Sequence, residues 1–338
     1  MTFFSRIVKI KEKIKRGVCM TEFKNGVARI KIPTPYKVGD VYAYVLKNDA
    51  LTLVDTGIGT QEAKAALIYE LHQLHLTLDD FDQIVLTHHH PDHSGGLSFF
   101  HPSIPVLAHE NNERWLTKSK DFIDFYGQYY HHFFSEFAVP SDRFKEIPKF
   151  QNNLKYIGNA KISQYLYESM ELPGHSQWEV IETFGHASSQ ISLWNKQTGQ
   201  LIAGDALLQF ITPNPLMEPP LYDGDQRYSA LLEHNKTLHK LKNLGIRTVL
   251  PGHGNIFNEV NEVIKTGLEK QEQRALKVWE LIKQKPRTVY ELCMLIFPRS
   301  YQKELVLTLS ETVAQLDYLL EKEMIKARQE GEKLIYFA

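Results

Sequence analysis

Residues 87–96, Thr-His-His-His-Pro-Asp-His-Ser-Gly-Gly, constrain this chain more than any other feature of its sequence. Within them, His88, His90, Asp92 and His93 place four potential zinc ligands inside six residues. A tight loop can point the first two side chains one way and the last two the other way, which suits two metal ions better than one four-ligand cage. The two glycines that end the segment let the backbone turn and pack closely behind such a site.

Three further candidate ligands, His186, Asp205 and His253, lie in turns that follow predicted strands. Each of them stands directly after a glycine. Asp55 ends another buried strand, within Leu-Val-Asp-Thr-Gly. Because functional loops gather where the strands of an α/β protein end, we expect these side chains to meet the 88–93 cluster in space.

The order of the predicted elements indicates an α/β fold with more than one domain, for which 338 residues are long enough. Strands dominate the region after residue 26, and strands and helices then alternate. Beyond residue 258 a long polar helix, two further helices and a terminal hairpin indicate a winged-helix-like module. The predicted division is a basic extension at 1–21, a main domain at 22–258 and a winged-helix-like domain at 259–338.

The composition sets few further limits. A net charge of -1 gives no reason to expect an obligatory nucleic-acid or anionic-membrane partner. Lysines interrupt the apolar stretches of the N-terminal extension, so no secretory signal is predicted, and no apolar run approaches the roughly 20 residues of a membrane span. The two cysteines, Cys19 and Cys293, offer no disulfide framework. Together these features predict a cytoplasmic protein.

The complete ordered set, from Asp55 through the 88–93 cluster to His186, Asp205 and His253, resembles the metallo-β-lactamase superfamily. The resemblance covers residues 22–258 and implies an αβ/βα sandwich that carries a hydrolytic metal centre. With the C-terminal module included, the chain resembles metallo-hydrolases that carry a lactamase-associated winged helix, and a related group of endoribonucleases.

The resemblance also implies a role for each candidate residue. Two ions would share a bridging hydroxide that attacks the substrate, Asp92 could pass a proton to the leaving group, and Asp55 would orient a ligand imidazole. The implied ligands are His88, His90 and His186 for the first ion, Asp92, His93 and His253 for the second, and Asp205 as a bridge between the two.

Zinc is the favoured metal, because His90 stands where the iron flavoprotein branch of the superfamily has a glutamate. Manganese and iron also suit imidazole and carboxylate ligands. The chain departs from the common pattern at Phe184, where proline is usual, and at Ser188 and Ser189, where Thr-Pro is frequent. These departures bear on the substrate rather than on the metals, since every ligand type is retained.

The other histidines are expected to lie outside the metal site. His89 should point away from it, because its neighbours on both sides point in. His131 and His132, in an aromatic segment at 111–137, could belong to a lid or to the wall of a pocket. The remaining histidines expected to serve in packing or at the surface are His101, His109, His175, His234 and His239.

Three functions fit these features. The first is hydrolysis of a small-molecule ester, thioester or lactone, the second is cleavage of a phosphodiester or of single-stranded RNA on the same metal centre, and the third is binding without catalysis. Retention of all seven ligands disfavours the third. A β-lactamase is also disfavoured, because the chain shows no export signal. The Pro-rich segment 211–225 should border the site, with Tyr222 and Arg227 as candidate substrate contacts.

The C-terminal module is expected to serve in packing or in a homodimer rather than to bind nucleic acid. A nucleic-acid winged helix normally has a basic recognition helix, whereas the helix predicted at 303–323 is mixed or acidic. Its apolar residues form one stripe that should be buried: Leu305, Leu309, Val313, Leu316 and Leu320.

Overall fold

The structure, a computed structural model, describes residues 21–338 apart from 222, 223 and 225. Thr21 excepted, the basic extension predicted for residues 1–21 lies outside the described residues, and so does the candidate substrate contact Tyr222. Within the described ranges, no helix combines the length and the hydropathy that crossing a membrane requires.

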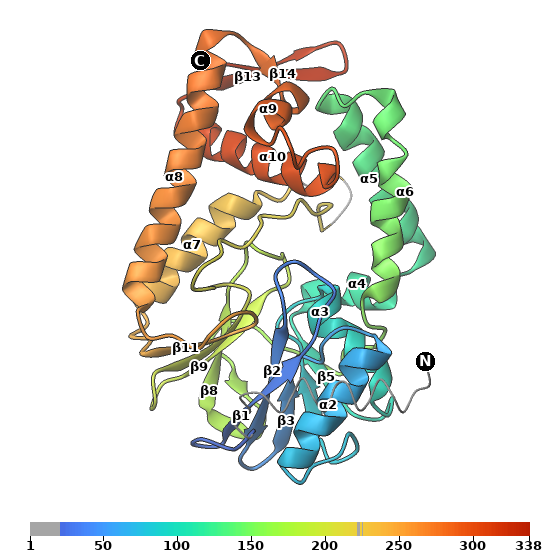
Figure 1. Ribbon diagram of the computed structural model, residues 1–338, viewed down its shortest axis with the longest axis vertical. Coiled ribbons are helices and arrows are strands. Elements are labelled where there is room, and N and C mark those ends of the chain that lie inside the picture. The colour runs from blue at the N-terminus through green and yellow to red at the C-terminus, as the bar shows by residue number, and fades with distance from the viewer. Residues whose placement is uncertain (1–20, 222–223, 225) are drawn as a thin grey trace.

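Two β-sheets stacked face to face form the lower half of the molecule in the view of Figure 1. The first sheet has the strand order β1-β2-β3-β4-β5-β6 and the second the order β11-β10-β9-β8-β7. The strands are β1 (Val27–Ile32), β2 (Val41–Lys47), β3 (Leu51–Val54), β4 (Gln83–Val85), β5 (Val106–Ala108), β6 (Gln164–Tyr165), β7 (Glu171–Leu172), β8 (His175–Glu182), β9 (Ile191–Asn195), β10 (Gln200–Gly204) and β11 (Thr248–Pro251).

Helices cover the outer faces of the sheets and build the upper half of the molecule (Figure 1). The α-helices are α2 (Gln61–Gln73), α3 (Pro91–Ser94), α4 (Glu113–Thr117), α5 (Lys120–Glu136), α6 (Glu146–Gln151), α7 (Ala230–Lys242), α8 (Val260–Gln284), α9 (Val289–Ile296) and α10 (Leu305–Glu321). Short 3-10 helices are η1 (Gly95–Phe99), η2 (Glu110–Asn112), η3 (Ser141–Arg143) and η4 (Asn152–Tyr156). A third sheet joins β12 (Arg287–Thr288), β14 (Lys333–Phe337) and β13 (Lys326–Glu330) in that order.

Apolar side chains on both sides of its strands give the first sheet two buried faces. In β2, Ala43 and Val45 belong to the core under the covering helix α2, whereas Tyr44 and Leu46 belong to the core between the sheets. Successive side chains of a strand point to opposite faces, so an unbroken apolar strand is buried on both sides. Trp178 of β8 packs into the same inter-sheet core from the second sheet.

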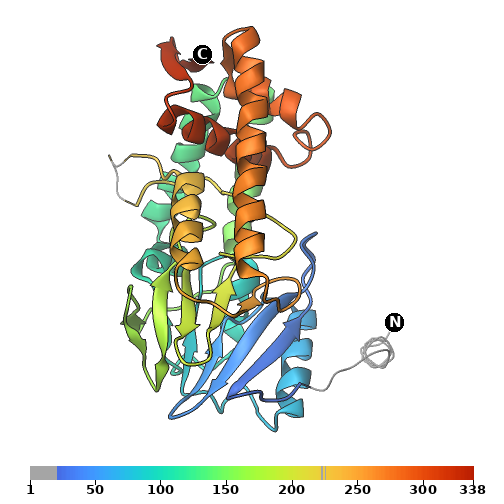
Figure 2. The ribbon, with the colours of Figure 1, turned by 90° about the vertical axis from the view of Figure 1, so that its left-hand side faces the viewer.

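Helices α7 and α8 cover the outer face of the second sheet, where Leu238, Leu241 and Ile264 pack against its strands (Figure 2). On the opposite side, α2 contributes Leu67 and Leu71 to the core of the first sheet. The layers are therefore helix, sheet, sheet and helix, which confirms the predicted αβ/βα sandwich.

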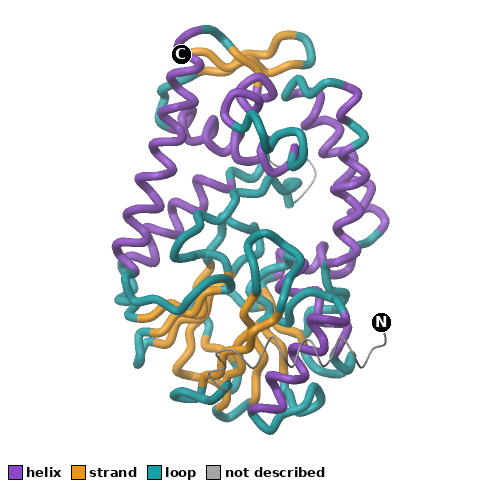
Figure 3. Tube along the Cα trace, in the orientation of Figure 1, coloured by secondary structure: helices purple, strands orange, loops and turns teal. Residues whose placement is uncertain are grey.

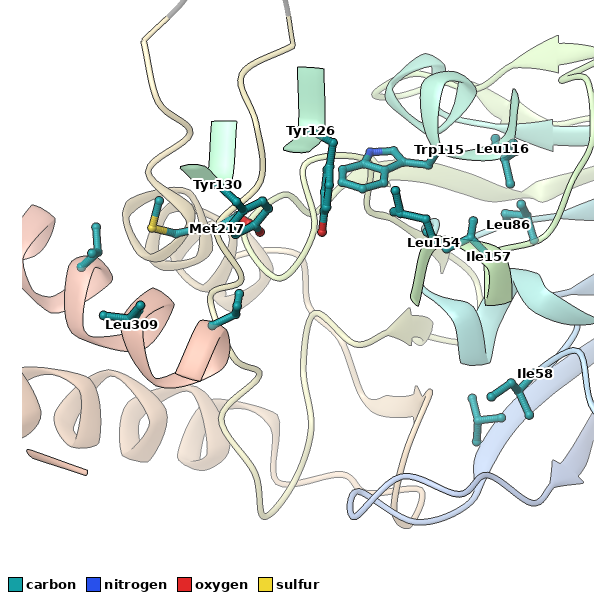
Figure 4. Packing of buried hydrophobic residues seen from close by; sticks show 14 of the residues in the cluster. Ile58, Leu86, Trp115, Leu116, Tyr126, Tyr130, Leu154, Ile157, Met217 and Leu309 are labelled. Atoms are coloured by element: carbon teal, nitrogen blue, oxygen red, sulfur yellow. The ribbon is translucent and has the colours of Figure 1, made fainter. Parts of the chain in front are cut away.

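A continuous apolar core joins this sandwich to the upper helices. Figure 4 shows it running from Ile58 through Trp115 and Tyr130 to Leu309 on α10. The aromatic segment at 111–137 forms α4 and α5, which are separated at Lys118, a residue with a left-handed backbone (φ 45°). The helices and the hairpin predicted after residue 258 are present, while the winged-helix assignment stays a prediction.

Helix α10 is buried around almost its whole circumference. Leu309, Val313 and Leu316 of the predicted stripe are fully buried. The structure also buries the polar side of the helix, including Ser310 and Asp317, which the stripe did not predict. An amphipathic pattern describes a helix with one covered face, whereas α10 contacts α8 and α9 on one side and α7 and the Pro-rich segment on another.

Candidate metal centre

The candidate ligands lie where strands of the two sheets end. Asp55 follows β3, and the 88–93 cluster follows β4, which pairs parallel with β3. His186 follows β8, while Asp205 and His253 follow the parallel strands β10 and β11. Figure 3 shows the loops gathered between these strands and the upper helices. Residues nearly 200 positions apart therefore reach one edge of the sandwich.

His88, His90 and His186 form the first cluster. His88 Nε2 lies 3.1 Å from His90 Nδ1, which in turn lies 2.9 Å from His186 Nε2. Burial, together with the neighbouring imidazoles, lowers the pKa of all three rings, that of His90 to about 3. Three neutral rings thus present nitrogen lone pairs to one small volume.

Asp92, His93 and His253 form the second cluster. His253 Nε2 lies 3.2 Å from Asp92 Oδ2. Burial opposes charge on His93 and His253, but nearby carboxylates outweigh it and raise the pKa of both rings. The second cluster is therefore richer in negative charge than the first.

Asp205 lies between the two clusters. Its Oδ1 is 3.4 Å from His93 Nε2, and its Oδ2 is 3.5 Å from His186 Nε2 and 3.6 Å from His253 Nε2. Burial alone would raise the pKa of this carboxyl, but His253 and His93 outweigh it and hold the pKa well below the usual range. An ionised carboxylate in this place can contact an ion in either cluster.

Four of the five imidazoles are fixed by a contact at the ring nitrogen that faces away from the clusters. Asp55 does this for His93: its Oδ2 accepts from His93 Nδ1 at 2.8 Å, and its two oxygens also accept from the backbone N and the Oγ1 of Thr87. The other three contacts are His88 Nδ1 with Thr87 Oγ1 (3.0 Å), His186 Nδ1 with the Asn214 carbonyl (3.3 Å) and His253 Nδ1 with the Asp40 carbonyl (2.9 Å).

Two glycines make the close packing possible. A Cβ on Gly252 would lie 2.4 Å from Asp205 Oδ1 and 2.8 Å from His93 Cε1, so any side chain there would collide with the clusters. A Cβ on Gly96 would lie 2.1 Å from the Thr56 carbonyl oxygen. The sequence had indicated glycines behind the site at the end of the 87–96 segment; the structure gives the reason for Gly96 and adds Gly252.

The donor set fits divalent cations. The ring nitrogens of three neutral imidazoles lie about 3 Å apart. A ring nitrogen carries at most one proton, so His90 Nδ1 cannot make a full hydrogen bond to both of its neighbours. His93 Nε2 and Asp205 Oδ1 are buried and have no hydrogen-bond partner among the described residues. Buried polar atoms are normally satisfied, and cations between the clusters would satisfy these atoms.

His89 points away from both clusters, in agreement with the expectation. Its ring stacks on Trp115, with centroids 4.0 Å apart and planes 5° apart, and its Nδ1 lies 2.8 Å from Ser189 Oγ. His131 and His132 are exposed on α5. The other histidines expected outside the site, His101, His109, His175, His234 and His239, belong to no metal-ligand cluster within the described ranges.

Two details near the site differ from what the sequence indicated. Arg227 forms a two-point ion pair with Asp317 of α10, so its guanidinium is engaged by a carboxylate rather than left for a substrate. Glu218, which sequence reasoning missed, is 1% exposed and lies beside His89 and His90. In the sequence, only its position in the Pro-rich segment pointed to Glu218, because an isolated glutamate belongs to no recognisable motif.

An αβ/βα sandwich with histidines and aspartates gathered at one edge is the architecture of a metal-dependent hydrolase. The chain belongs to the metallo-beta-lactamase superfamily, whose sequence pattern matches residues 36–253. It is 36% identical over 311 residues to the "Probable metallo-hydrolase YqjP" of Bacillus subtilis, covering 92% of this chain and 97% of that protein. The protein is therefore a metallo-hydrolase with His and Asp metal-binding groups.

Solved structures extend the likeness beyond the sandwich. The metallo-beta-lactamase family protein TTHA1429 from Thermus thermophilus is 26% identical, has a TM-score of 0.77 and covers 93% of this chain and 99% of its own. A beta-lactamase domain protein from Burkholderia ambifaria shares the fold, with 18% identity, a TM-score of 0.75 and 94% of each chain covered. Coverage this high has to include most of the helices that follow residue 258.

Proposed function

We propose that the chain is a binuclear metal-dependent hydrolase that acts on a small-molecule ester, thioester or lactone. The observation that carries this proposal is the approach of Asp205 to both clusters, within 3.6 Å of His93, His186 and His253. One carboxylate shared by an all-imidazole cluster and a mixed cluster is the arrangement that two adjoining ions require.

The ligands proposed for the first ion are His88, His90 and His186, those for the second are Asp92, His93 and His253, and Asp205 would touch both. Two bound cations would supply Lewis-acid activation of water and of the substrate's polar group. Zinc is the proposed metal, because imidazole dominates the donor set. No thiolate contributes, so manganese and iron are the alternatives.

The protein's own side chains would orient the metal ligands and transfer protons. Asp55 holds His93 by its Nδ1, which fixes the direction of Nε2. Asp92, 8% exposed and at the cluster margin, is the carboxylate proposed to carry a proton to the leaving group. Tyr36 is a partly exposed neighbour of Asp92: burial, the Asp92 charge and Tyr156 raise the pKa of Tyr36 to about 12. A neutral aromatic hydroxyl at this margin suits an uncharged acyl substrate.

Two contacts favour an acyl substrate over a polyanion. Arg227, a candidate substrate contact whose charge would suit a polyanion, is paired with Asp317. Helix α10, the candidate recognition helix of a winged-helix module, is enclosed by its neighbours, whereas a recognition helix must present a face to a groove of DNA. The proposed division at residue 258, a homodimer and a cytoplasmic location stay predictions of the sequence.

The experiment is an activity panel beside elemental analysis. Purified protein loaded with zinc, manganese or iron is offered aryl esters, acyl thioesters, lactones, bis-aryl phosphates and single-stranded RNA. We expect two ions per chain and the highest kcat/KM on one acyl class. Faster turnover of the phosphodiester or of RNA would contradict the proposed acyl substrate class. A metal content no higher than trace would contradict the proposed metal centre.

A further inference from the structure

His90 differs from the other four imidazoles at its second ring nitrogen. Its Nδ1 faces the first cluster, 3.1 Å from His88 Nε2 and 2.9 Å from His186 Nε2. Its Nε2 is buried and has no hydrogen-bond partner among the described residues. A neutral imidazole that binds a metal through Nδ1 carries its proton on Nε2. A buried N–H without an acceptor is destabilising, so this ring needs an acceptor.

Glu218 is a buried carboxylate that lies beside His90. One of its oxygens and one ring nitrogen from each of His89 and His90 lie within 4.8 Å of one another. His89 Nε2 is 3.8 Å from Glu218 Oε1, so the carboxylate faces the back of the 88–93 cluster. His90 Nε2 and Glu218 form no direct hydrogen bond, and a side-chain rotation or one bridging water can join groups that lie within 4.8 Å of one another.

The carboxylate also contacts the second loop of the first cluster. The backbone N of Ser188, two residues beyond His186, donates to Glu218 Oε1 at 3.1 Å, and the Ser188 hydroxyl donates to Oε2. Glu218 therefore touches both segments that carry ligands of the first cluster. Asp55 occupies the corresponding place for His93 in the second cluster.

Tertiary contacts hold the Pro-rich segment that carries Glu218. The backbone N of Met217 donates to Ser310 Oγ of α10 at 3.2 Å, and its carbonyl accepts from Tyr130 Oη of α5 at 2.5 Å. Arg114 donates to the carbonyls of the two prolines that follow Glu218, at 2.6 and 2.8 Å. The position of the carboxylate is thus set by helices outside the sandwich.

We propose that Glu218 is a positioning residue that accepts a hydrogen bond from His90 Nε2, directly or through one water, and so aims Nδ1 at the first metal position. This inference rests on the proposed binuclear site. Outer carboxylates of this kind fix the tautomer and the ring direction of a ligating histidine. The role is specific to the first metal position, because Glu218 contacts neither His93 nor His253 in any hydrogen bond or ion pair of the described residues.

The test is Glu218→Gln, measured by competition for zinc with a chelator and by the visible spectrum of the cobalt-loaded protein. We expect affinity at the first position to fall roughly 10–100-fold, the cobalt spectrum of that position to change, and affinity at the second position to stay within about twofold. His88→Ala identifies the spectral signal of the first position, because it removes a ligand of that position.

The matched control is Glu311→Gln. Glu311 is also a buried carboxylate, 8% exposed, whose Oε1 pairs with Arg274 at 2.9 Å on the far side of α10. The same substitution there should leave both affinities unchanged. Wild-type affinity in Glu218→Gln, or an equal loss in Glu311→Gln, would overturn the inference.

Ser188→Ala is a second variant in case Glu218→Gln does not fold. It keeps the carboxylate and removes one of the hydrogen bonds that orient it, so a smaller loss at the same position is expected; no loss, with Glu218→Gln unfolded, would overturn the inference. The two proposals fail differently. A wild-type protein that binds fewer than two ions ends both, whereas two ions bound equally well by Glu218→Gln end only this one.

Discussion

The two clusters of the candidate metal centre each take two residues from the same short segment, 88–93, and yet they differ in charge. The first consists of His88, His90 and His186, all with a lowered pKa and no carboxylate of their own. The second contains Asp92, and its two imidazoles have a raised pKa because carboxylates surround them. Within the 88–93 segment, His88 and His90 belong to the first cluster, whereas Asp92 and His93 belong to the second.

This difference shows how each position is stabilised. The second cluster has its own negative charge, and Asp55 beside His93 adds another carboxylate. The first relies on soft imidazole donors, on Asp205 and on contacts from loops, such as the Asn214 carbonyl. Loss of a shared group should therefore harm both positions, whereas loss of a supporting group should harm only one.

Asp205→Ala should have the largest effect. It removes the carboxylate that lies between the clusters, within 3.4–3.6 Å of three imidazoles. We expect metal content below half of the wild-type value and hydrolysis at background. Elemental analysis of the purified variant, beside circular dichroism to verify the fold, checks this. Retention of two ions would show that the two clusters bind metal without a shared carboxylate, which would contradict the role of Asp205.

His88→Ala should abolish activity while sparing part of the metal. His88 is 0% exposed and contributes to the first cluster, so about one ion per chain should remain, in the second position. Elemental analysis and the cobalt spectrum give the number and the place of the ions. Two ions at wild-type affinity would contradict the assignment of His88.

Asp55→Asn should weaken the second position selectively. The substitution keeps the size of the side chain but removes the charge that faces His93 Nδ1. Affinity at the second position should fall roughly 10–100-fold, with the first position little changed. Chelator competition measures both, and a preferential loss at the first position would reverse the proposed roles of the clusters.

His89→Ala should leave metal binding nearly unchanged, although it alters the neighbour of a ligand. The stack on Trp115 and the contact with Ser189 Oγ are lost, so the free energy of unfolding should drop by about 2–4 kcal/mol. Denaturant unfolding measures the drop, and elemental analysis measures the metal. Because His88 and His89 are adjacent, equal metal loss in the two variants would argue against the directions assigned to their rings.

Much of the fold and most of the candidate site could be predicted because their signals are local. Apolar strands such as β2 show their burial in their own residue order. The 88–93 segment and the glycine-preceded turns at His186, Asp205 and His253 carry ligand types at strand ends, and the structure brings all seven side chains together. The pairing of Arg227 with Asp317 could not be predicted, because a lone arginine in the sequence does not show that Asp317 lies beside it.

Sequence by itself determined the layers of the sandwich and the candidate metal-binding groups, since strand periodicity and ligand chemistry are properties of neighbouring residues. Only the tertiary structure decided which ring nitrogen each histidine turns inward, that α10 is enclosed on both sides, and that Glu218 lies behind His90. Those outcomes depend on contacts between segments far apart in the sequence, such as Met217 with Tyr130 and Ser310, and no local pattern encodes such contacts.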